Sequence, residues 1–258
     1  MDTSMKDQRV VVTAGAQGIG LAISETFVSA GARVHLCDVN PEFIASARAK
    51  LPTVTTSLTD VSNEDHVRAM FADLEQRWGA LDVLVNNAGI AGPTAEIENT
   101  ELSEWQQTIA VNLTGTFLCT RSAVPLIRKA GGGSIVNLSS AAGRLGFPLR
   151  SPYSASKFGV IGLTKTWAME LGPSKIRVNA ILPGVVTGER QERVISAKAA
   201  ALGIDHEAMR ERLLSRVSMR MMVSPYDIAN QILFICSPAG QTISGQSLSV
   251  CGNVELLG

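Results

Sequence analysis

A serine, a tyrosine and a lysine stand in an order that can move a proton to or from an alcohol oxygen. Ser140 precedes Tyr153, and Lys157 follows it in the segment Tyr153-Ser154-Ala155-Ser156-Lys157. Residues four apart share one helix face, so the Lys157 ammonium would lie one turn from the Tyr153 phenol. A neighbouring positive charge stabilises phenolate, which makes tyrosine a usable acid or base. Ser140 would then hydrogen-bond the substrate oxygen. An incidental Tyr and Lys on a helix is the alternative.

A glycine-rich turn near the amino terminus can receive the phosphates of a dinucleotide. The apolar run Arg9–Thr13 leads into Ala14-Gly15-Ala16-Gln17-Gly18-Ile19-Gly20, and an amphipathic pattern follows. Glycines there permit a tight turn and let a pyrophosphate approach a helix N-terminus. We expect Ala14 to be extended. The predicted cofactor contacts in this turn are Gly15, Gln17, Gly18, Ile19 and Gly20.

Asp38 indicates which dinucleotide binds. It ends the second apolar run, where a carboxylate can hydrogen-bond the adenosine ribose hydroxyls and repel a 2′-phosphate. Gln17 brings no positive charge that would hold such a phosphate. The pattern therefore favours NAD over NADP. A glycine turn without a ligand and a solvated aspartate are the alternatives.

Short β-branched runs alternate with longer helix-patterned segments along the chain. This alternation predicts an α/β fold, a doubly wound parallel sheet of about seven strands, in one domain over residues 1–258. Residues 188–220 are charged and rich in Ala, Met and Arg, and we expect them to form a helical substrate lid; a surface excursion is the alternative. Ser62 with Asp65, and Ser224 with Asp227, predict capped helix starts. The expected strands are Arg9–Thr13, Arg33–Cys37, Val54–Ser57, Val83–Asn86, Ser134–Leu138, Arg177–Leu182 and Ser247–Val250.

Composition excludes several classes of partner. The 23 basic and 23 acidic residues cancel, so no overall positive field would attract nucleic acid or an anionic membrane. The four cysteines form no C-x-x-C pair, and such usage suits a reducing compartment. No apolar run is long enough to span a bilayer, and the first residues lack the pattern of a secretory signal. We expect a cytoplasmic protein without a metal site.

Together, these residues resemble the short-chain dehydrogenase/reductase family along essentially the whole chain. The resemblance rests on the Tyr-x-x-x-Lys pair with its upstream serine, the glycine turn, Asn86-Asn87-Ala88-Gly89 and Pro183-Gly184, in the family's order. It implies a Rossmann-type fold and catalysis by Ser140, Tyr153 and Lys157, with Asn112 holding a water in a proton relay behind Lys157. Lys157 would also hold the nicotinamide ribose. Further cofactor contacts implied by the family are Asp60 and Val61 at the adenine, Asn87, Ala88, Gly89, Tyr153, Pro183 and Gly184, and Val186 at the carboxamide.

A nearby arginine suggests the substrate class. Arg150 lies three residues before Tyr153, and a guanidinium can hold a carboxylate through two hydrogen bonds. With Ser140 and Tyr153 it would bind a hydroxy or keto acid, and Arg144 and Arg190 are further candidates. Pairing of Arg150 with Glu189, or its solvation, is the alternative. The segment Gly184–Arg190 is similar to that of sugar-acid dehydrogenases of the 2-keto-3-deoxy type, while a polyol or a simple secondary alcohol remains open.

The same residues leave two other functions open, and they bear on the oligomeric state. A 3-oxoacyl-thioester reductase resembles the chain throughout, but Asp38 speaks against the NADPH that reductive biosynthesis draws on. A protein that senses NAD without turnover would tolerate the loss of Tyr153 or Lys157, and both are present. The family resemblance suggests a homotetramer. Apolar residues beyond one sheet-facing stripe on two helices agree with it, and internal packing is the alternative; these residues are Trp105, Phe117, Phe158 and Trp167.

Overall fold

Seven parallel strands form one sheet. The computed structural model describes residues 2–257, with the backbone alone at Arg190, Ala197, Lys198 and Ala201. The strand order is β3-β2-β1-β4-β5-β6-β7, so the chain changes direction across the sheet between β1 and β4. Open α/β sheets bind ligands at such a switch point. The predicted fold class is confirmed, and each expected strand is present within one residue at either end. The strands are β1 (Arg9–Thr13), β2 (Arg33–Asp38), β3 (Thr55–Leu58), β4 (Val83–Asn86), β5 (Gly133–Leu138), β6 (Ile176–Pro183) and β7 (Ser247–Val250).

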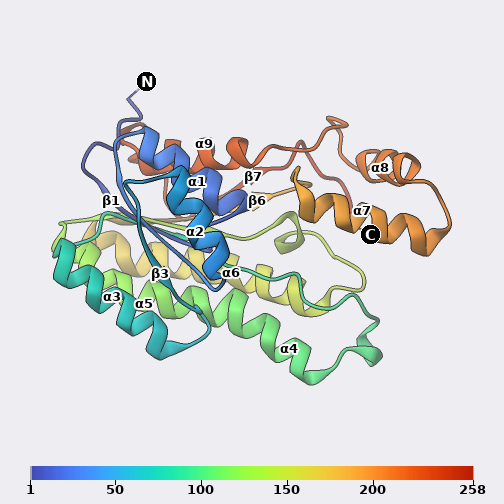
Figure 1. The fold of residues 1–258 in the computed structure, drawn as a ribbon, viewed down its shortest axis with the longest axis horizontal. Coiled ribbons are helices and arrows are strands. Elements are labelled where there is room, and N and C mark those ends of the chain that lie inside the picture. Colours follow the sequence, from blue (N-terminus) through green and yellow to red (C-terminus); the bar gives the residue numbers. More distant parts are fainter. Residues whose placement is uncertain (1, 258) are drawn as a thin grey trace.

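Helices cover both faces of the sheet (Figure 1). Because successive side chains of a strand point to opposite faces, Val10 and Val12 belong to one buried cluster and Val11 to the other. The first cluster lies beneath α1 (Gly18–Ser29), α2 (Pro41–Lys50) and α9 (Pro225–Cys236). The second lies beneath α3 (Glu64–Trp78), α5 (Gly115–Lys129) and α6 (Ser151–Leu171), with α4 (Leu102–Ile109) preceding α5. Short 3₁₀ turns occur at Ile97–Asn99, Ala141–Gly143, Gly172–Ser174 and Pro238–Gly240.

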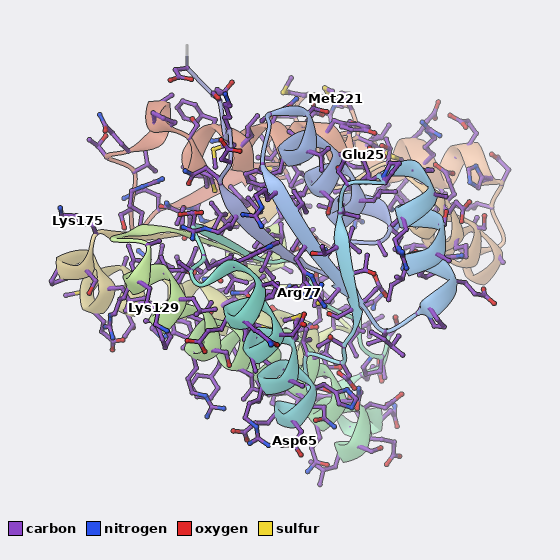
Figure 2. All side chains as sticks on the ribbon, turned by 60° about the vertical axis from the view of Figure 1, so that its left-hand side comes forward. Glu25, Asp65, Arg77, Lys129, Lys175 and Met221 are labelled. Atoms are coloured by element: carbon purple, nitrogen blue, oxygen red, sulfur yellow. The ribbon has the colours of Figure 1, made fainter. Side chains whose placement is uncertain are left out.

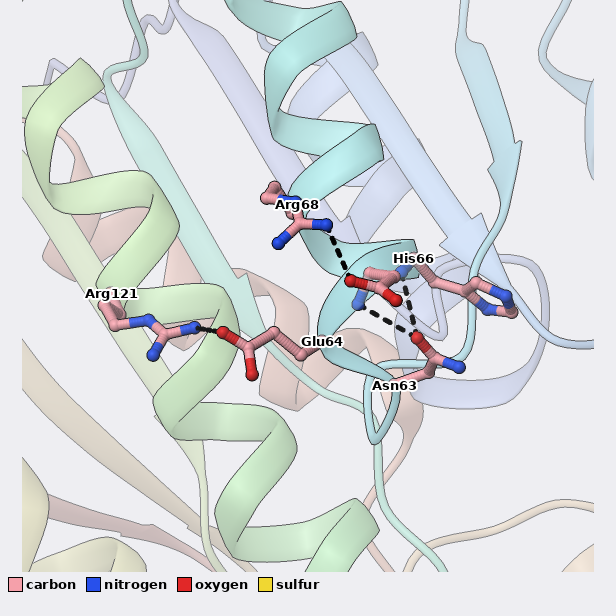
Figure 3. Close-up of polar contacts among 6 residues, drawn as sticks. Asn63, Glu64, His66, Arg68 and Arg121 are labelled. Atoms are coloured by element: carbon pink, nitrogen blue, oxygen red, sulfur yellow. Dashed lines mark hydrogen bonds and ion pairs between the residues drawn. The ribbon is translucent and has the colours of Figure 1, made fainter.

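The start of α3 differs from the sequence prediction (Figure 3). Asn63, and not Ser62, caps this helix, and its side-chain oxygen accepts hydrogen bonds from the backbone N–H groups of Asp65 and His66. The Ser62 hydroxyl donates instead to the carboxylate of Asp60, 2.6 Å away, which removes it from the capping position. The predicted capping box of Ser224 and Asp227 at the start of α9 is confirmed.

The region expected to be a lid forms two helices that project beyond the sheet (Figure 1). These are α7 (Glu189–Leu202) and α8 (His206–Leu214), and they pack around Ile195 and Met209 in a cluster of their own. Val217, after α8, pairs with Val254 of the carboxyl-terminal segment, which ties the end of this region to the body of the protein. The helical content is thus as predicted, and a lid function stays a prediction.

An acidic residue and two basic ones lie at opposite ends of the parallel strands (Figure 2). Asp65 lies in the first turn of α3, at the edge where the strands end, whereas Lys129 and Lys175 lie at the opposite edge, where the strands begin. None of the described helices is long and apolar enough to cross a bilayer.

His35 of β2 is fully buried and faces side chains of the neighbouring strand β3. The ring nitrogens of His35 lie 2.9 Å from Thr55 Oγ1 and 3.0 Å from Ser57 Oγ, and Trp78 packs edge-on against the ring. Burial lowers the pKa of His35 to about 4; Asp73 opposes this shift and Arg77 adds to it. The fold therefore favours the neutral ring.

Stability should decrease on acidification because of His35. An unfolded histidine has a pKa of about 6.5, so the contribution is complete above that pH and is lost as the pH falls toward 4. We expect a loss of about 2 kcal/mol by pH 5 from this group. Urea unfolding of wild type and His35→Gln between pH 7.5 and 5 measures it, with the exposed His66→Gln as control. Equal pH slopes in wild type and His35→Gln would contradict the assignment.

Candidate active site

The carboxyl ends of the strands bring the predicted catalytic residues to one edge. Ser140 follows β5, and Tyr153 and Lys157 lie in the first two turns of α6. Ser140 is the N-cap of the short turn Ala141–Gly143, and its Oγ accepts a hydrogen bond from Ala142 N at 3.1 Å. This bond uses the oxygen as an acceptor, so the hydroxyl proton can be donated toward a substrate.

Lys157 is the buried charge of the site. Its side chain is 4% exposed, and its Nζ donates to the carbonyl oxygen of Leu138, the last residue of β5, at 2.8 Å. The same ammonium lies 5.6 Å from the centre of the Tyr153 ring. Tyr153 is half-buried, and Phe147 packs edge-on against it. The predicted Tyr-Lys pair is thus brought together.

Asn112 lies in a single π-helical turn, Ala110–Thr114, between α4 and α5. Such turns recur at functional sites. The Asn112 side chain is fully buried; its Oδ1 accepts from Ile90 N at 2.8 Å, and its Nδ2 donates to Ile90 O and to Ser156 Oγ, each at 3.0 Å. A Cβ atom placed on Gly89 would lie 3.4 Å from both Asn112 Oδ1 and Lys157 Nζ. Asn112 and Lys157 therefore face the same small space.

The glycine turn has the predicted place but not the predicted backbone at Ala14. Ala14 has φ +47° and is not extended, which corrects the expectation from the sequence. Gly18, at φ +54°, begins α1 with open space where a Cβ would be. A Cβ on Gly20 would lie 2.0 Å from Ala14 O, so the turn packs too closely for a side chain there. Gln17 is exposed, and Ile19 packs partly against the core.

The end of β4 is fastened to this turn. Asn87 Nδ2 donates to the carbonyl oxygens of Thr13 and Ala14, both at 3.0 Å. Thr13 Oγ1 accepts from the backbone N–H groups of Asn87 and Ala88, also at 3.0 Å. The two segments predicted to contact the cofactor are thus held together by side chains from each.

Asp38 fits the role of a ribose-binding residue. It is 5% exposed, and its Oδ1 accepts from Val39 N and Asn40 N at 2.8 and 3.2 Å. Its Oδ2 is buried without a hydrogen-bond partner in the described structure. A buried carboxylate oxygen is costly to leave unpaired, so a donor such as a ribose hydroxyl would complete it. With the N-terminus of α1, whose first turn holds no acidic residue, the residues present fit a dinucleotide without a 2′-phosphate.

The remaining predicted cofactor contacts lie along the same edge. Asp60 Oδ1 is occupied by the N–H and hydroxyl of Ser62, and Val61 packs against Gly115. Pro183 ends β6, and a Cβ on Gly184 would lie 2.6 Å from Cys251 Cβ, so this position requires glycine. Val186 pairs with Val223 just before α9.

The candidate substrate arginines have different surroundings. Arg150 Nη1 donates to the carbonyl oxygens of Ala91 and Gly92 at 3.1 and 3.3 Å, and its guanidinium lies over the Phe147 ring. Arg150 thus contacts the loop after β4, a partner that the sequence did not suggest. Arg144 contacts β7 through Ser249 Oγ and Ser247 O. The side chain of Arg190 lies outside the described residues.

Sequence reasoning missed four polar contributors. Thr13 holds the loop after β4, and Ser156 contacts Asn112 as described above. Ser139 Oγ donates to the carbonyl oxygen of Lys157 at 2.9 Å, and Asn137 Oδ1 accepts from Asn86 Nδ2 across the β4–β5 pair at 2.8 Å. A polar residue at the end of an otherwise apolar strand was the available signal for Thr13, Asn137 and Ser139. Ser156 had no signal apart from its position beside Lys157.

Comparison with known proteins places this geometry among oxidoreductases. The family model described as enoyl-(acyl carrier protein) reductase matches residues 13–253. The chain is 35% identical to 3-oxoacyl-[acyl-carrier-protein] reductase of Thermotoga maritima over 95% of this chain and 97% of that protein. It is 36% identical to a probable galactose dehydrogenase of Rhizobium meliloti, covering 97% and 96% of the two chains. It is 35% identical to cis-4-hydroxycyclohexanecarboxylate dehydrogenase of Sinomonas cyclohexanicum, covering 98% of both.

Solved structures agree along the whole chain. Actinorhodin polyketide ketoreductase with NADPH is 30% identical and superimposes with a TM-score of 0.92, covering 96% of this chain and 97% of that one. NAD⁺-bound xylitol dehydrogenase is 28% identical with a TM-score of 0.89, covering 96% and 98%. The two similar structures thus carry different nicotinamide cofactors.

The positive φ of Ala14 predicts a stabilising substitution. An alanine in the left-handed region is strained, and glycine relieves this at the cost of greater freedom in the unfolded chain. We expect Ala14→Gly to raise the free energy of unfolding by about 0.5 kcal/mol. Ala130→Gly is the matched control, because Ala130 has φ −73°, and should lower it by about 0.5–1 kcal/mol. Denaturant unfolding compares them; a destabilised Ala14→Gly would be the opposing result.

Proposed function

This chain belongs to the short-chain dehydrogenase/reductase family and is an oxidoreductase of alcohols or ketones, and we propose that it is an NAD-dependent dehydrogenase of a secondary alcohol. The observation that carries the choice of NAD is the buried, unpartnered Oδ2 of Asp38 at the end of β2. A ribose hydroxyl would donate to this oxygen, whereas a 2′-phosphate would meet its negative charge. Gly15, Gly18 and Gly20 would hold the pyrophosphate side at the start of α1.

Ser140, Tyr153 and Lys157 would carry the proton chemistry. The Ser140 hydroxyl donates a hydrogen bond to the substrate oxygen and orients the carbinol carbon. Tyr153, as phenolate, takes the hydroxyl proton during oxidation, and the Lys157 ammonium, 5.6 Å from the ring centre, stabilises that negative charge. The bound nicotinamide supplies the acceptor for the hydride that leaves the same carbon. Reduction of a ketone uses the same groups in reverse.

Lys157 and Asn112 would pass the proton onward from Tyr153. The Lys157 ammonium is fixed by Leu138 O, and both it and Asn112 Oδ1 border the space beside Gly89. A water held there would connect the two groups. Lys157 would also bind the nicotinamide ribose, so the same buried cation would serve both the proton path and cofactor binding.

Turnover with NAD is the test of this function. Absorbance at the NADH band, with NAD or NADP and a panel of sugar acids, polyols and simple secondary alcohols, should reveal NAD-linked oxidation. Tyr153→Phe should lower kcat by about 10³-fold, since it removes the acid-base group. The chain has two tyrosines, and Tyr226→Phe is the matched control because Tyr226 is exposed on α9. A Tyr153→Phe variant as active as wild type would favour an NAD-binding protein without this chemistry.

Cofactor choice should depend on the charge of Asp38. Asp38→Asn removes the repulsion of a 2′-phosphate but keeps the side-chain size, so the preference for NAD over NADP in kcat/KM should fall by about 100-fold. Asp38→Glu retains the charge and should still favour NAD. Initial rates with both cofactors give the ratios. An unchanged ratio in Asp38→Asn would remove Asp38 from this role.

We also propose that the substrate is a hydroxy or keto acid, such as a sugar-derived acid of the 2-keto-3-deoxy type. Two observations support it. Arg150 and Tyr153 both pack against the ring of Phe147, so the guanidinium lies near the predicted acid-base residue. One relative is named for a hydroxy carboxylate. Arg190 is a second candidate for the carboxylate. Galactose and xylitol, after which two of the similar proteins are named, are neutral polyhydroxy compounds. These names favour the alternative that the substrate is an uncharged polyol and not an acid.

An acid and its neutral amide separate these substrates. If Arg150 binds the carboxylate, Arg150→Ala should lower kcat/KM for the acid by about 100-fold and for the amide much less. If Arg150 serves only the carbonyls of Ala91 and Gly92, both substrates should lose equally. Arg144→Ala is the control, because the guanidinium of Arg144 bonds to Ser247 and Ser249 of β7. Equal losses would leave the dehydrogenase assignment intact and exclude Arg150 as the anion site.

A 3-oxoacyl-thioester reductase is the second candidate, favoured by the name of the Thermotoga maritima relative. It would use Ser140, Tyr153 and Lys157 in the reductive direction. The same absorbance assay, run with a 3-oxoacyl thioester and NADPH or NADH, separates the candidates. Fast thioester reduction with NADPH would support this second function over the first.

We propose a homotetramer in the cytoplasm. Phe117 on α5 and Phe158 on α6 are 41% and 48% exposed, and such apolar groups suit burial by another copy, whereas Trp167 packs into the core of its own chain. Light scattering would then give four times the 27.3 kDa chain mass. The four thiols are unpaired, which suits a reducing compartment.

A further inference from the structure

We propose that Ser156 is a positioning residue that, together with the backbone of Ile90, holds the orientation of the Asn112 amide against the helix of Tyr153 and Lys157. The inference rests on the proposed function, because it concerns the proton path through Lys157 and Asn112. Ser156 itself would touch neither substrate nor cofactor. Its effect on the reaction would pass through Asn112.

The hydroxyl of Ser156 makes two bonds in a place closed to water. Its side chain is fully buried, its Oγ donates to Tyr153 O at 2.7 Å, and it accepts from Asn112 Nδ2 at 3.0 Å. A hydroxyl has one hydrogen, and the bond to Tyr153 uses it. The side facing Asn112 therefore offers lone pairs only, and it accepts an N–H but not a carbonyl oxygen. This polarity selects Nδ2, and not Oδ1, as the atom that faces Ser156.

The selected orientation is the one that serves Lys157. With Nδ2 toward Ser156 and Ile90 O, the oxygen Oδ1 accepts from Ile90 N. Oδ1 then lies, like Lys157 Nζ, 3.4 Å from the position of a Cβ on Gly89. A flipped amide would place two N–H donors where the ammonium already brings its own, and a water between them would lose an acceptor. Ser156 thus helps to keep an oxygen on the Lys157 side.

The bond also adds a hydrogen bond between two elements that pack against each other, as Gly159 packs against Leu113. Asn112 belongs to the π-helical turn Ala110–Thr114, while Ser156 and Tyr153 belong to α6. Because Ser156 bonds to the carbonyl of Tyr153 itself, it links the relay residue directly to the turn that carries the phenol. Without this bond, one Nδ2 hydrogen would be buried without a partner, and only the two bonds to Ile90 would hold the amide.

The experiment removes the hydroxyl and follows both the amide and the reaction. Ser156→Ala should lower kcat by 10- to 100-fold with little change in KM for NAD or substrate, as expected for a misplaced relay group. The solvent deuterium isotope effect on kcat should rise, because proton transfer would become slower than hydride transfer. Ser156→Cys keeps nearly the same volume and a weak donor, so its kcat should lie between those of wild type and Ser156→Ala. It tests the same proposal when the alanine variant is unstable.

Ser154→Ala is the matched control. Ser154 lies in the same helix and its Oγ donates to Ala142 O at 3.1 Å, with no bond to Asn112. It should keep the wild-type isotope effect. In a double-mutant cycle, Ser156→Ala should have no further effect on kcat once Asn112→Ala is present. Additive losses would overturn the proposal, as would a wild-type kcat in Ser156→Ala.

Hydrogen exchange separates this inference from the proposed function. In Ser156→Ala, and not in Ser154→Ala, the peptides that contain Ile90 and Ala110–Thr114 should exchange faster, since Ile90 N–H is held by Asn112 Oδ1. This readout needs no substrate. Unchanged exchange would overturn the role of Ser156 even in an active enzyme. Absence of turnover in wild type, with the exchange change present, would overturn only the proposed function.

Discussion

The ammonium of Lys157 lies in a place that is almost closed to solvent, and polar groups of the chain must replace the water that it has lost. A buried charge costs several kcal/mol unless polar partners replace water. Leu138 O supplies one partner from the last residue of β5. Because Lys157 is anchored there, the first turns of α6 lie against the end of β5, and Tyr153 lies with the centre of its ring 5.6 Å from the Lys157 Nζ. These two contacts thus join the helix of the predicted acid-base pair to the end of the sheet.

The parallel sheet makes this arrangement possible. All seven strands end at the same edge, so the glycine turn after β1, Asp38 at the end of β2, the Asn87 loop after β4 and Ser140 after β5 come together although they are far apart in the chain. Side chains then join these loops to one another. Asn87 bonds to the carbonyls of Thr13 and Ala14, and Arg150 bonds to those of Ala91 and Gly92. Such bonds satisfy backbone groups that irregular segments would otherwise leave unpaired.

The candidate active site combines a part that is shared with the relatives and a part that can vary. The chain superimposes over 96% of its length on each of two solved oxidoreductases, with TM-scores of 0.92 and 0.89, although one carries NADPH and the other NAD⁺. The fold alone therefore does not decide between the two cofactors, and the proposed choice of NAD rests on a single group, Asp38. Differences in substrate would depend on the loops that bear Phe147 and Arg150 and on α7 and α8, which pack around their own small core. Separate packing permits such a region to change without disturbing the sheet.

The sequence by itself determined the strands and the order of the motifs, and it predicted which residues would do the acid-base chemistry, because hydrophobic periodicity and short-range spacing are local properties of the chain. It did not determine the conformation of Ala14, since the turn is shaped by the close approach of Gly20 and Asn87. It missed the Asn63 cap, because two neighbouring residues were both able to cap and only the contact of Ser62 with Asp60 decided between them. The partners of Arg150, Ser156 and Asn112 were decided by tertiary structure alone. Their hydrogen bonds join segments distant in sequence, and no local pattern records which polar groups meet when the sheet edge is assembled.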